Sequence, residues 1–482
     1  MKTNFKKLIP WILFTLVVGG LIAWIFISKR TTQEELLSYD QKLKEANLHY
    51  ESKEFSTAMS LFYEATDIVP EKVDAYEGIV NILLSKNRVD DAYDIVKKSA
   101  KRVNQNDQAL LYSLIGDYYY NVKDFNSAKS MYEESLGIGI SYPQGQLSYA
   151  KTLLQLGKVD DAKNILQREI YEGDLLYEAK LILSYVYSIQ DVEKAKSTVK
   201  SIVPSDSWKV YYEEIGDVLN SLNDDEKFNA TKLSRVYINN GYPYLAISLL
   251  EPKEESMAEY LEGLYFLGRA YYEYSENQKC INVLDKAISL GGLESEISWT
   301  QARAYWELND LENAIEKYDK AVAYSGEKVS KELIKEYINI LLDNNQGLKA
   351  EEILKKIINY NEEAWSRILL IEVYYKLENS EKVNFYISSL KDFDLEVEDE
   401  KEFLYWKTIM LIEKDDMNTA KSTAAELLLL DKYNPKYYFL IGRISFVNGN
   451  VEETKSNLEK CIEYDLDYEI TESALKLLSR VK

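Results

Sequence analysis

Residues 300–314 read TQARAYWELNDLENA, and the same arrangement recurs in three further stretches of the chain. These are LIGDYYYNVKDFNSA at 114–128, FLGRAYYEYSENQKC at 266–280 and LIGRISFVNGNVEET at 440–454. In each stretch a small residue is followed by aromatic or apolar residues, a polar turn and a second small residue. Such self-similarity indicates a repeat architecture, in which short helical units stack on one another. It also suits a chain of 482 residues, which is too long for one ordinary core.

The second small position recurs along nearly the whole chain, with steps that are mostly 33 to 37 residues long. The positions are Ala58, Ala92, Ala128, Ala162, Ala195, Ala246, Cys280, Ala314, Ala350, Val383, Ala420 and Thr454. The exceptional step of 51 residues, from Ala195 to Ala246, predicts an extra helix around residues 208–222.

This pattern resembles the tetratricopeptide repeat, L-G-x-x-Y followed by A-x-x-x-F and A. The resemblance implies an all-α, right-handed superhelical solenoid of about twelve helix pairs, with the first helix of each pair lining the concave face. The chain departs from the family where Val383 and Thr454 replace the small residue, and the signature Trp and Pro are mostly absent.

Close packing within each pair gives the period its physical reason. Small residues on the first helices let the second helix approach, namely Ala46, Gly116, Ala150, Gly268, Ala302 and Gly442. Larger side chains on the second helices fill the groove behind, namely Phe62, Tyr132, Leu166, Leu284, Tyr318 and Leu354. One pair cannot bury its apolar face alone, so neighbouring pairs must stack.

The N-terminus predicts a membrane anchor. Leu8 to Ile27 is a run of 20 residues without a charge, which as a helix spans about 30 Å, the thickness of the hydrocarbon core. A cleaved signal peptide is the alternative, but the run is longer than a usual signal-peptide core and no A-x-A site precedes Ser28. The flanking basic residues favour a single-pass protein of the bacterial cytoplasmic membrane with its body extracytoplasmic.

The expected layout follows the chain from end to end. It comprises a short basic segment at 1–7, a transmembrane helix at 8–28, a linker at 29–38, repeats one to five at 39–205, an inserted helix or degenerate unit at 206–226, repeats six to twelve at 227–468 and a capping helix at 469–482.

Composition excludes several functions. The net charge is −22, and residues 1–30 hold five basic residues and no acidic ones, so the rest of the chain carries −27 and should repel nucleic acid. The two cysteines, Cys280 and Cys461, sit in apolar helical patterns and should be buried. With one histidine and no nucleotide-binding loop, nucleophile motif or metal-ligand spacing, we expect no catalysis, no cofactor and no metal.

A candidate peptide-binding groove follows from the register of the first helices. Arg235, Arg269 and Arg303 are each 34 positions apart, and the same step relates Tyr265 to Trp299 and Tyr272 to Trp306. In the last unit, Arg443 takes the equivalent place, with Phe439 and Phe446 around it. These residues could hold a peptide through its carboxylates and carbonyl groups.

The structural alternative is an ion pair between each arginine and the next unit. Glu262, Glu296 and Glu332 recur at the start of the following first helices and could be the partners. The binding hypothesis predicts that Arg269→Ala combined with Arg303→Ala abolishes partner capture and leaves the melting profile nearly unchanged.

The sequence therefore predicts a membrane-anchored scaffold or adaptor that binds other proteins or peptides and organises proteins of the cell envelope. The alternative is a membrane-bound targeting receptor on the cytosolic side. Some tetratricopeptide proteins bind the free carboxylate of chaperone tails through Lys and Asn residues, but here Leu43, Gly78 and Leu110 occupy positions of that clamp.

Overall fold

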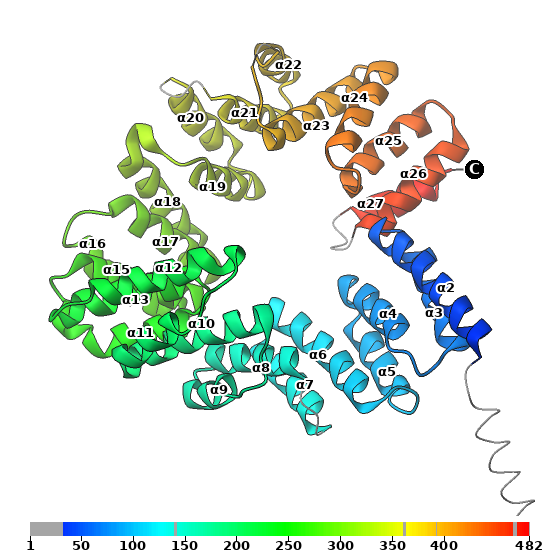
Figure 1. Cartoon of the computed structure of the whole chain (residues 1–482). Helices are drawn as coiled ribbons and strands as arrows, with labels where there is room; N and C mark the ends of the chain where they lie inside the picture. The colour runs from blue at the N-terminus through cyan, green and yellow to red at the C-terminus, as the bar shows by residue number, and fades with distance from the viewer. Residues whose placement is uncertain (1–31, 139–141, 360–362, 392, 466–469, 482) are drawn as a thin grey trace, which may run out of the picture. The chain divides into compact units, whose positions relative to one another are not determined.

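The computed structural model describes residues 32–138, 142–359, 363–391, 393–465 and 470–481. Over these residues the chain forms 26 α-helices, α2 to α27, and three short 3-10 helices, with no β-strand. Figure 1 shows the α-helices following one another through short connections. The prediction of an all-α chain built from successive helix pairs is confirmed.

The chain divides into two compact units, Met1–Ile115 and Gly116–Lys482, with helix α6 running across the boundary. The helices that begin in the first unit are α2 (Gln33–Glu51), α3 (Phe55–Ile68), α4 (Asp74–Ser85), α5 (Val89–Ser99) and α6 (Gln105–Asn121).

The second unit holds the remaining helices. They are α7 (Phe125–Gly137), α8 (Pro143–Gln155), α9 (Val159–Leu166), α10 (Gly173–Gln190), α11 (Val192–Lys200), α12 (Asp206–Ser221), α13 (Glu226–Asn239), α14 (Pro243–Leu250), α15 (Leu261–Glu273), α16 (Asn277–Ile288), α17 (Glu294–Glu307), α18 (Leu311–Ser325), α19 (Lys331–Asp343), α20 (Gly347–Ile358), α21 (Ala364–Lys376), α22 (Ser380–Ser389), α23 (Val397–Glu413), α24 (Met417–Leu430), α25 (Pro435–Val447), α26 (Val451–Tyr464) and α27 (Thr471–Leu478). The 3-10 helices are η1 (Glu251–Lys253), η2 (Glu255–Met257) and η3 (Gly326–Lys328).

The small residues of the repeat lie at the contact between paired helices. All twelve positions from Ala58 to Thr454 are at most 1% exposed, and this set includes Cys280. A Cβ atom built on Gly116 would lie 2.7 Å from the ring of Tyr132, and one on Gly442 would lie 2.7 Å from a methyl carbon of Leu458. The predicted packing is therefore confirmed, because the second helix can come this close only where the first helix carries no side chain.

The turns inside the pairs share a backbone feature. In eleven of the twelve pairs, the residue five positions before the second small residue has a positive φ, as at Ser275 (64°), Glu378 (55°) and Gly449 (73°). Its N–H and the next N–H bond back to the last turn of the first helix; Glu378, for example, donates to the carbonyl of Tyr375 at 3.0 Å. These left-handed residues end the first helix and fix the reversal of the chain.

Helix α12 occupies the long step of the repeat, and it changes which pairs meet. The pair α13–α14 packs against α8, two pairs earlier in the chain. Gln155, at the end of α8, donates from Nε2 to the carbonyl of Gly241 at 2.7 Å. This contact joins residues 86 positions apart in the sequence, and the pair α10–α11 and helix α12 lie between them along the chain.

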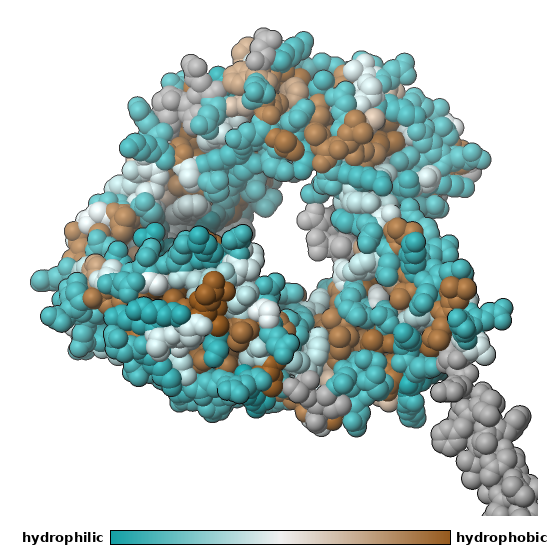
Figure 2. All heavy atoms as spheres, in the orientation of Figure 1, coloured by the Kyte–Doolittle hydropathy of each residue, from teal (hydrophilic) through white to brown (hydrophobic). Residues whose placement is uncertain are grey.

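The predicted transmembrane helix at 8–28 lies outside the described residues. In the parts of the chain that the structure does describe, none of the helices has both the length and the apolar character needed to cross a membrane. Figure 2 shows hydrophilic residues over most of the visible face, with hydrophobic residues in separate patches.

Candidate peptide-binding surface

The first helices of successive pairs contact one another in the second unit. Helix α13 packs on α15 and α15 on α17, and further along the chain α19 packs on α21, α21 on α23 and α23 on α25. Helices α17 and α19 are joined by the ion pair between Arg303 and Glu336. We call the surface formed by α13, α15, α17, α19, α21, α23 and α25 the first-helix face. Every residue of the predicted groove belongs to one of these helices.

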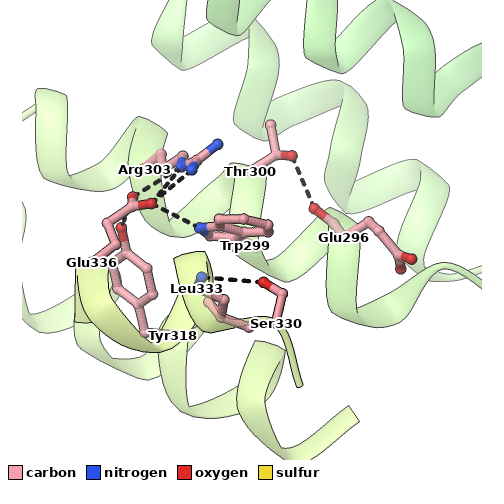
Figure 3. A network of polar contacts seen from close by, with 8 residues as sticks. All are labelled: Glu296, Trp299, Thr300, Arg303, Tyr318, Ser330, Leu333 and Glu336. Carbon is pink, nitrogen blue, oxygen red and sulfur yellow. Dashed lines mark hydrogen bonds and ion pairs between the residues drawn. The ribbon is translucent and has the colours of Figure 1, made fainter. Parts of the chain in front are cut away.

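Arg303 on α17 is held by the next pair of the array. Its Nε donates to both carboxylate oxygens of Glu336 on α19, at 2.8 and 2.9 Å, and its Nη2 donates at 2.7 Å. The indole of Trp299 donates to the same carboxylate at 3.1 Å, and the hydroxyl of Tyr318 donates to it as well. Figure 3 shows the side chains from α17, α18 and α19 converging on Glu336.

The arginine also stacks on its own helix. The guanidinium carbon of Arg303 lies 4.1 Å from the centre of the Trp299 ring, so the cation is placed between an aromatic face and a carboxylate. Burial alone would raise the pKa of Glu336, but the hydrogen bonds from Arg303 and Tyr318 outweigh it and lower this pKa. The Glu336 carboxylate is therefore kept ionised and fully engaged.

This network changes the predicted ion-pair partner of Arg303. The sequence named Glu332 as the alternative partner of Arg303, whereas the partner is Glu336, one helical turn further along the same face. The repeat spacing of about 34 residues points to the helix starts and so does not indicate Glu336, which lies one turn further along α19 within reach of the long arginine side chain. Because Arg303 is hydrogen-bonded to Glu336, we now expect the combined Arg269→Ala and Arg303→Ala variant to melt at a lower temperature than the wild type.

Arg269 on α15 has a different environment. Its guanidinium carbon lies 6.0 Å from the ring centres of both Tyr265 and Phe266. Within the described ranges, neither Arg269 nor Arg235 forms an ion pair, so Glu262 and Glu296 are not their partners. Arg269 is half-buried and hydrogen-bonds to the Tyr265 side chain, and because a guanidinium has five N–H donors, others remain available.

Tyr265 and Tyr272 belong to the same neighbourhood. Burial raises the pKa of Tyr265, and the charges of Arg269 and Arg303 oppose that rise. Burial likewise raises the pKa of Tyr272 to about 12, against the charge of Arg303. The structure thus brings five of the predicted residues together on two adjacent helices, and we call them the α15–α17 cluster: Tyr265, Arg269, Tyr272, Trp299 and Arg303.

The other predicted residues lie at the edges of this cluster or apart from it. Arg235 is exposed on α13, and Trp306 is 38% exposed at the end of α17. Phe439, Arg443 and Phe446 lie on α25, where they are half-buried. The charge of Arg443 acts on Tyr375 of α21 and Tyr405 of α23, so this arginine belongs to a second aromatic group.

Ion pairs cross the first-helix face between the two groups. Lys331 on α19 donates to Asp399 on α23 at 2.6 Å, and Lys335 donates to Glu402 at 2.6 Å. Asp399 is only 5% exposed. These bridges join helices two pairs apart, so they occupy the face beside α21 and separate the α15–α17 cluster from the surroundings of Arg443.

Three segments of the chain match families of known repeats. Residues 262–328 and residues 109–138 match the tetratricopeptide repeat, and residues 296–361 match the YpiA-like, C-terminal tetratricopeptide repeats. These three segments therefore carry repeats of the tetratricopeptide class, which are typical of protein–protein interaction scaffolds. No curated protein sequence matches the chain.

Solved structures resemble the chain over long stretches at low identity. One is a tetratricopeptide repeat protein from Parabacteroides merdae, with 17% identity and a TM-score of 0.40 over 53% of this chain and 99% of that one. A chain of the complex of Naa15/Naa10 bound to HypK-THB has 12% identity and a TM-score of 0.38, over 92% of this chain and 96% of that one. Yeast Tom70 has 13% identity and a TM-score of 0.35, over 92% of this chain and 95% of that one. Similarity at this level identifies no partner.

Proposed function

We propose that this chain is a membrane-tethered adaptor that binds segments of partner proteins on its first-helix face, at the α15–α17 cluster. The observation that carries the proposal is the position of Arg269. It lies beside aromatic rings without a carboxylate partner, whereas Arg303, one repeat later, is engaged by Glu336. A half-buried arginine with free donors suits a carboxylate or backbone carbonyl of an incoming peptide.

The surroundings of Arg269 favour an extended peptide that contacts several helices. Exposed Arg235 lies on the preceding first helix, and exposed Trp306 lies on the following one. Aromatic and arginine side chains carry much of the binding energy at protein interfaces, because they bury large areas and make directional hydrogen bonds. The ligand class is a protein segment with acidic residues, and we expect no binding to nucleic acid.

Tethering rests on the N-terminal run Leu8 to Ile27, which we propose inserts in the lipid bilayer as an uncleaved anchor. The basic residues before it favour a body outside the cytoplasm, where the partners would be envelope proteins. A C-terminal reporter enzyme that is active only outside the cytosol tests this topology. Activity would exclude the cytosolic targeting receptor, and inactivity would exclude the envelope adaptor.

The binding site is tested by combining Arg235→Ala with Arg269→Ala. The matched control combines Lys279→Ala with Lys286→Ala on the second helix α16, which removes the same charge from the other layer. Cross-linking and mass spectrometry in the native cell should recover partners with the wild type and the control but lose them with the double arginine variant. Partners that persist in the arginine variant would contradict the site.

A further inference from the structure

Helix α23 begins earlier in its repeat than the two first helices before it. Helix α19 begins 19 residues before Ala350 (331 to 350), α21 begins 19 residues before Val383 (364 to 383), and α23 begins 23 residues before Ala420 (397 to 420). The difference is one additional helical turn, residues 397–400. This turn carries Asp399, which is only 5% exposed. A nearly buried carboxylate requires a partner, so the contacts of Asp399 decide what the additional turn does.

Two ion pairs connect α23 to α19. Asp399 accepts a hydrogen bond from Nζ of Lys331 at 2.6 Å, and Glu402 accepts one from Nζ of Lys335 at 2.6 Å. Helix α19 packs on α21 and α21 on α23, so a whole helix pair lies between the partners along the array. In a stacked array each repeat contacts chiefly its neighbours, so a bond that skips one pair restrains the bend of the array at that point.

The ion pair between Lys335 and Glu402 passes over α21. Burial and the charge of Glu402 raise the pKa of Glu372 on α21, and the charges of Lys376 and Lys335 oppose that rise. Glu372 therefore lies close to both members of the ion pair. The first-helix face at α21 is thus occupied by charged side chains from the two flanking helices.

Lys331 occupies an unfavourable position in its own helix. It is the first residue of α19, where the unpaired N–H groups of the helix repel a positive charge. Asp399 is the third residue of α23, where the helix N-terminus favours a carboxylate. The ion pair therefore offsets a repulsion within α19 and joins the first turns of two helices.

The outer layer adds little apolar packing at this pair. Val383 is the one buried residue of α22, whose ten residues the structure describes in full. The flanking second helices α20 and α24 each bury four residues. Phe385 on α22 is 64% exposed. The second-helix layer therefore opposes bending of the array only weakly here, and the ion pairs on the first-helix face have the larger effect.

We propose that the two ion pairs form a latch that fixes the bend of the solenoid at α21 and opens when the pairs are broken. We call it the α19–α23 latch, and its members are Lys331, Lys335, Asp399 and Glu402. The closed latch separates the α15–α17 cluster from the surroundings of Arg443. When the latch opens, the first turn of α23 moves away from α19, because Asp399 must reach water once its ammonium partner is gone. The latch concerns the shape of the array and requires no ligand, so it goes beyond the proposed function.

Salt should open the latch, because three of its four side chains are partly exposed. The side chains of Lys331 and Lys335 are 25% and 28% exposed, and that of Glu402 is 42% exposed. Raising the salt concentration to about 1 M shortens the Debye length to about 3 Å and screens such pairs. The apolar packing between α19, α21 and α23 is not screened, so the array changes its bend without unfolding.

The experiment measures the distance between α19 and α23 by double electron–electron resonance, with the full chain in detergent. Spin labels are attached to Asn339→Cys on α19 and Val397→Cys on α23, which are both exposed positions. The native Cys280 and Cys461 are buried and should not take up label. The mean distance at about 1 M salt should exceed that at about 0.05 M by on the order of 3–5 Å, which is more than the roughly 1–2 Å by which packed helices usually shift.

Variants separate the latch from a general loosening of the array. Lys331→Gln combined with Lys335→Gln should give, at low salt, the longer distance that the wild type shows at high salt. Lys335→Glu should also open the latch, and adding Glu402→Lys should restore the wild-type distance, since the reversed pair keeps the attraction. The matched control combines Lys286→Gln with Lys421→Gln, which breaks one ion pair on either side of the latch and should leave the distance unchanged.

The latch is refuted if high salt leaves the wild-type distance constant, if the reversed pair fails to restore it, or if the control lengthens it as much as the paired glutamine variant does. The salt titration requires no substitution within the latch, so it decides the question even if a latch variant does not fold. Partner capture through Arg269 enters none of these distances, so the latch and the proposed function fail separately.

Discussion

The guanidinium of Arg303 on α17 and the carboxylate of Glu336 on α19 share three hydrogen-bond contacts of 2.7 to 2.9 Å. This relationship joins one helix pair to the next on the first-helix face. It also divides the arginine series by role, because Arg303 stabilises the array while Arg269 keeps its donors available. The following predictions depend on that division and on the packing rules of the repeat.

Glu336→Ala should destabilise the α17–α19 region by about 1–3 kcal/mol, since it leaves the half-buried Arg303 and the Tyr318 hydroxyl without their acceptor. The measurement is chemical denaturation together with hydrogen exchange of the amides in α17 to α19. As a control, Glu316→Ala removes an exposed pair with Lys320 and should cost at most about 0.5 kcal/mol. Equal effects at the two sites would show that Glu336 has no special role.

Acid should weaken the junction of α20 and α22 through Glu351. Hydrogen bonds from Lys355 and Lys382 lower the pKa of Glu351 from 4.5 to about 2. Because the folded pKa lies below the unfolded one, the stabilisation is complete above pH 4.5 and is lost as the pH falls toward 2. Carbon NMR should find the Glu351 carboxyl still ionised at about pH 3, and Glu351→Gln should flatten the acid dependence of stability. A carboxyl that titrates near its ordinary pKa would contradict the ion-pair network.

Two Gly→Ala substitutions in helix interiors should act in opposite directions. At Gly116, the added Cβ would lie 2.7 Å from the Tyr132 ring, and a hydrogen bond to Asp117 holds this ring, so we expect a loss of about 1–2 kcal/mol. At Gly216 on α12, the nearest atom is 3.7 Å away, so the better helix propensity of alanine should add about 0.5–1 kcal/mol. Urea denaturation of each variant measures both effects. A gain in stability at Gly116 would refute the close approach of paired helices.

The left-handed turn residues give a second pair of opposite effects. Glu378→Gly relieves a positive φ of 55° and should stabilise the protein by about 0.5–1 kcal/mol. Gly449→Ala places a Cβ at a φ of 73°, where no neighbouring atom lies within 4 Å, and should destabilise it by about 1 kcal/mol through the backbone alone. Thermal melting of the two variants should shift in opposite directions. Shifts in the same direction would mean that side-chain contacts outweigh the backbone strain.

The period of the small residues predicted the helix pairs because it reflects a local rule. Ala58 and its eleven counterparts are buried since each second helix must meet its own first helix a few residues away. The αL position five residues earlier was missed, because Lys123, Ser275 and Glu378 stand where glycine is the usual signal. At these turns the hydrogen bonds of the chain reversal set the conformation, and the residue type does not reveal it.

The site could be predicted only in part, because its contacts join different repeats. The register of Arg269, Tyr265 and Trp299 follows from the period, and these residues do lie on neighbouring helices. The choice of Glu336 over Glu332, and the contact of Gln155 with Gly241, depend on how whole pairs stack and on the space that α12 takes. No periodicity within the chain encodes those distances.

Site-specific photocross-linking tests the central claim most directly. A photoreactive amino acid replaces Trp306, exposed on the first-helix face, or Leu348, which is 72% exposed on the second helix α20. In the native membrane, the residue-306 probe should form discrete cross-links to partner proteins that disappear when Arg235→Ala and Arg269→Ala are added, while the residue-348 probe should not form them. The same cross-links from residue 348, or their persistence without the two arginines, would contradict binding at the α15–α17 cluster.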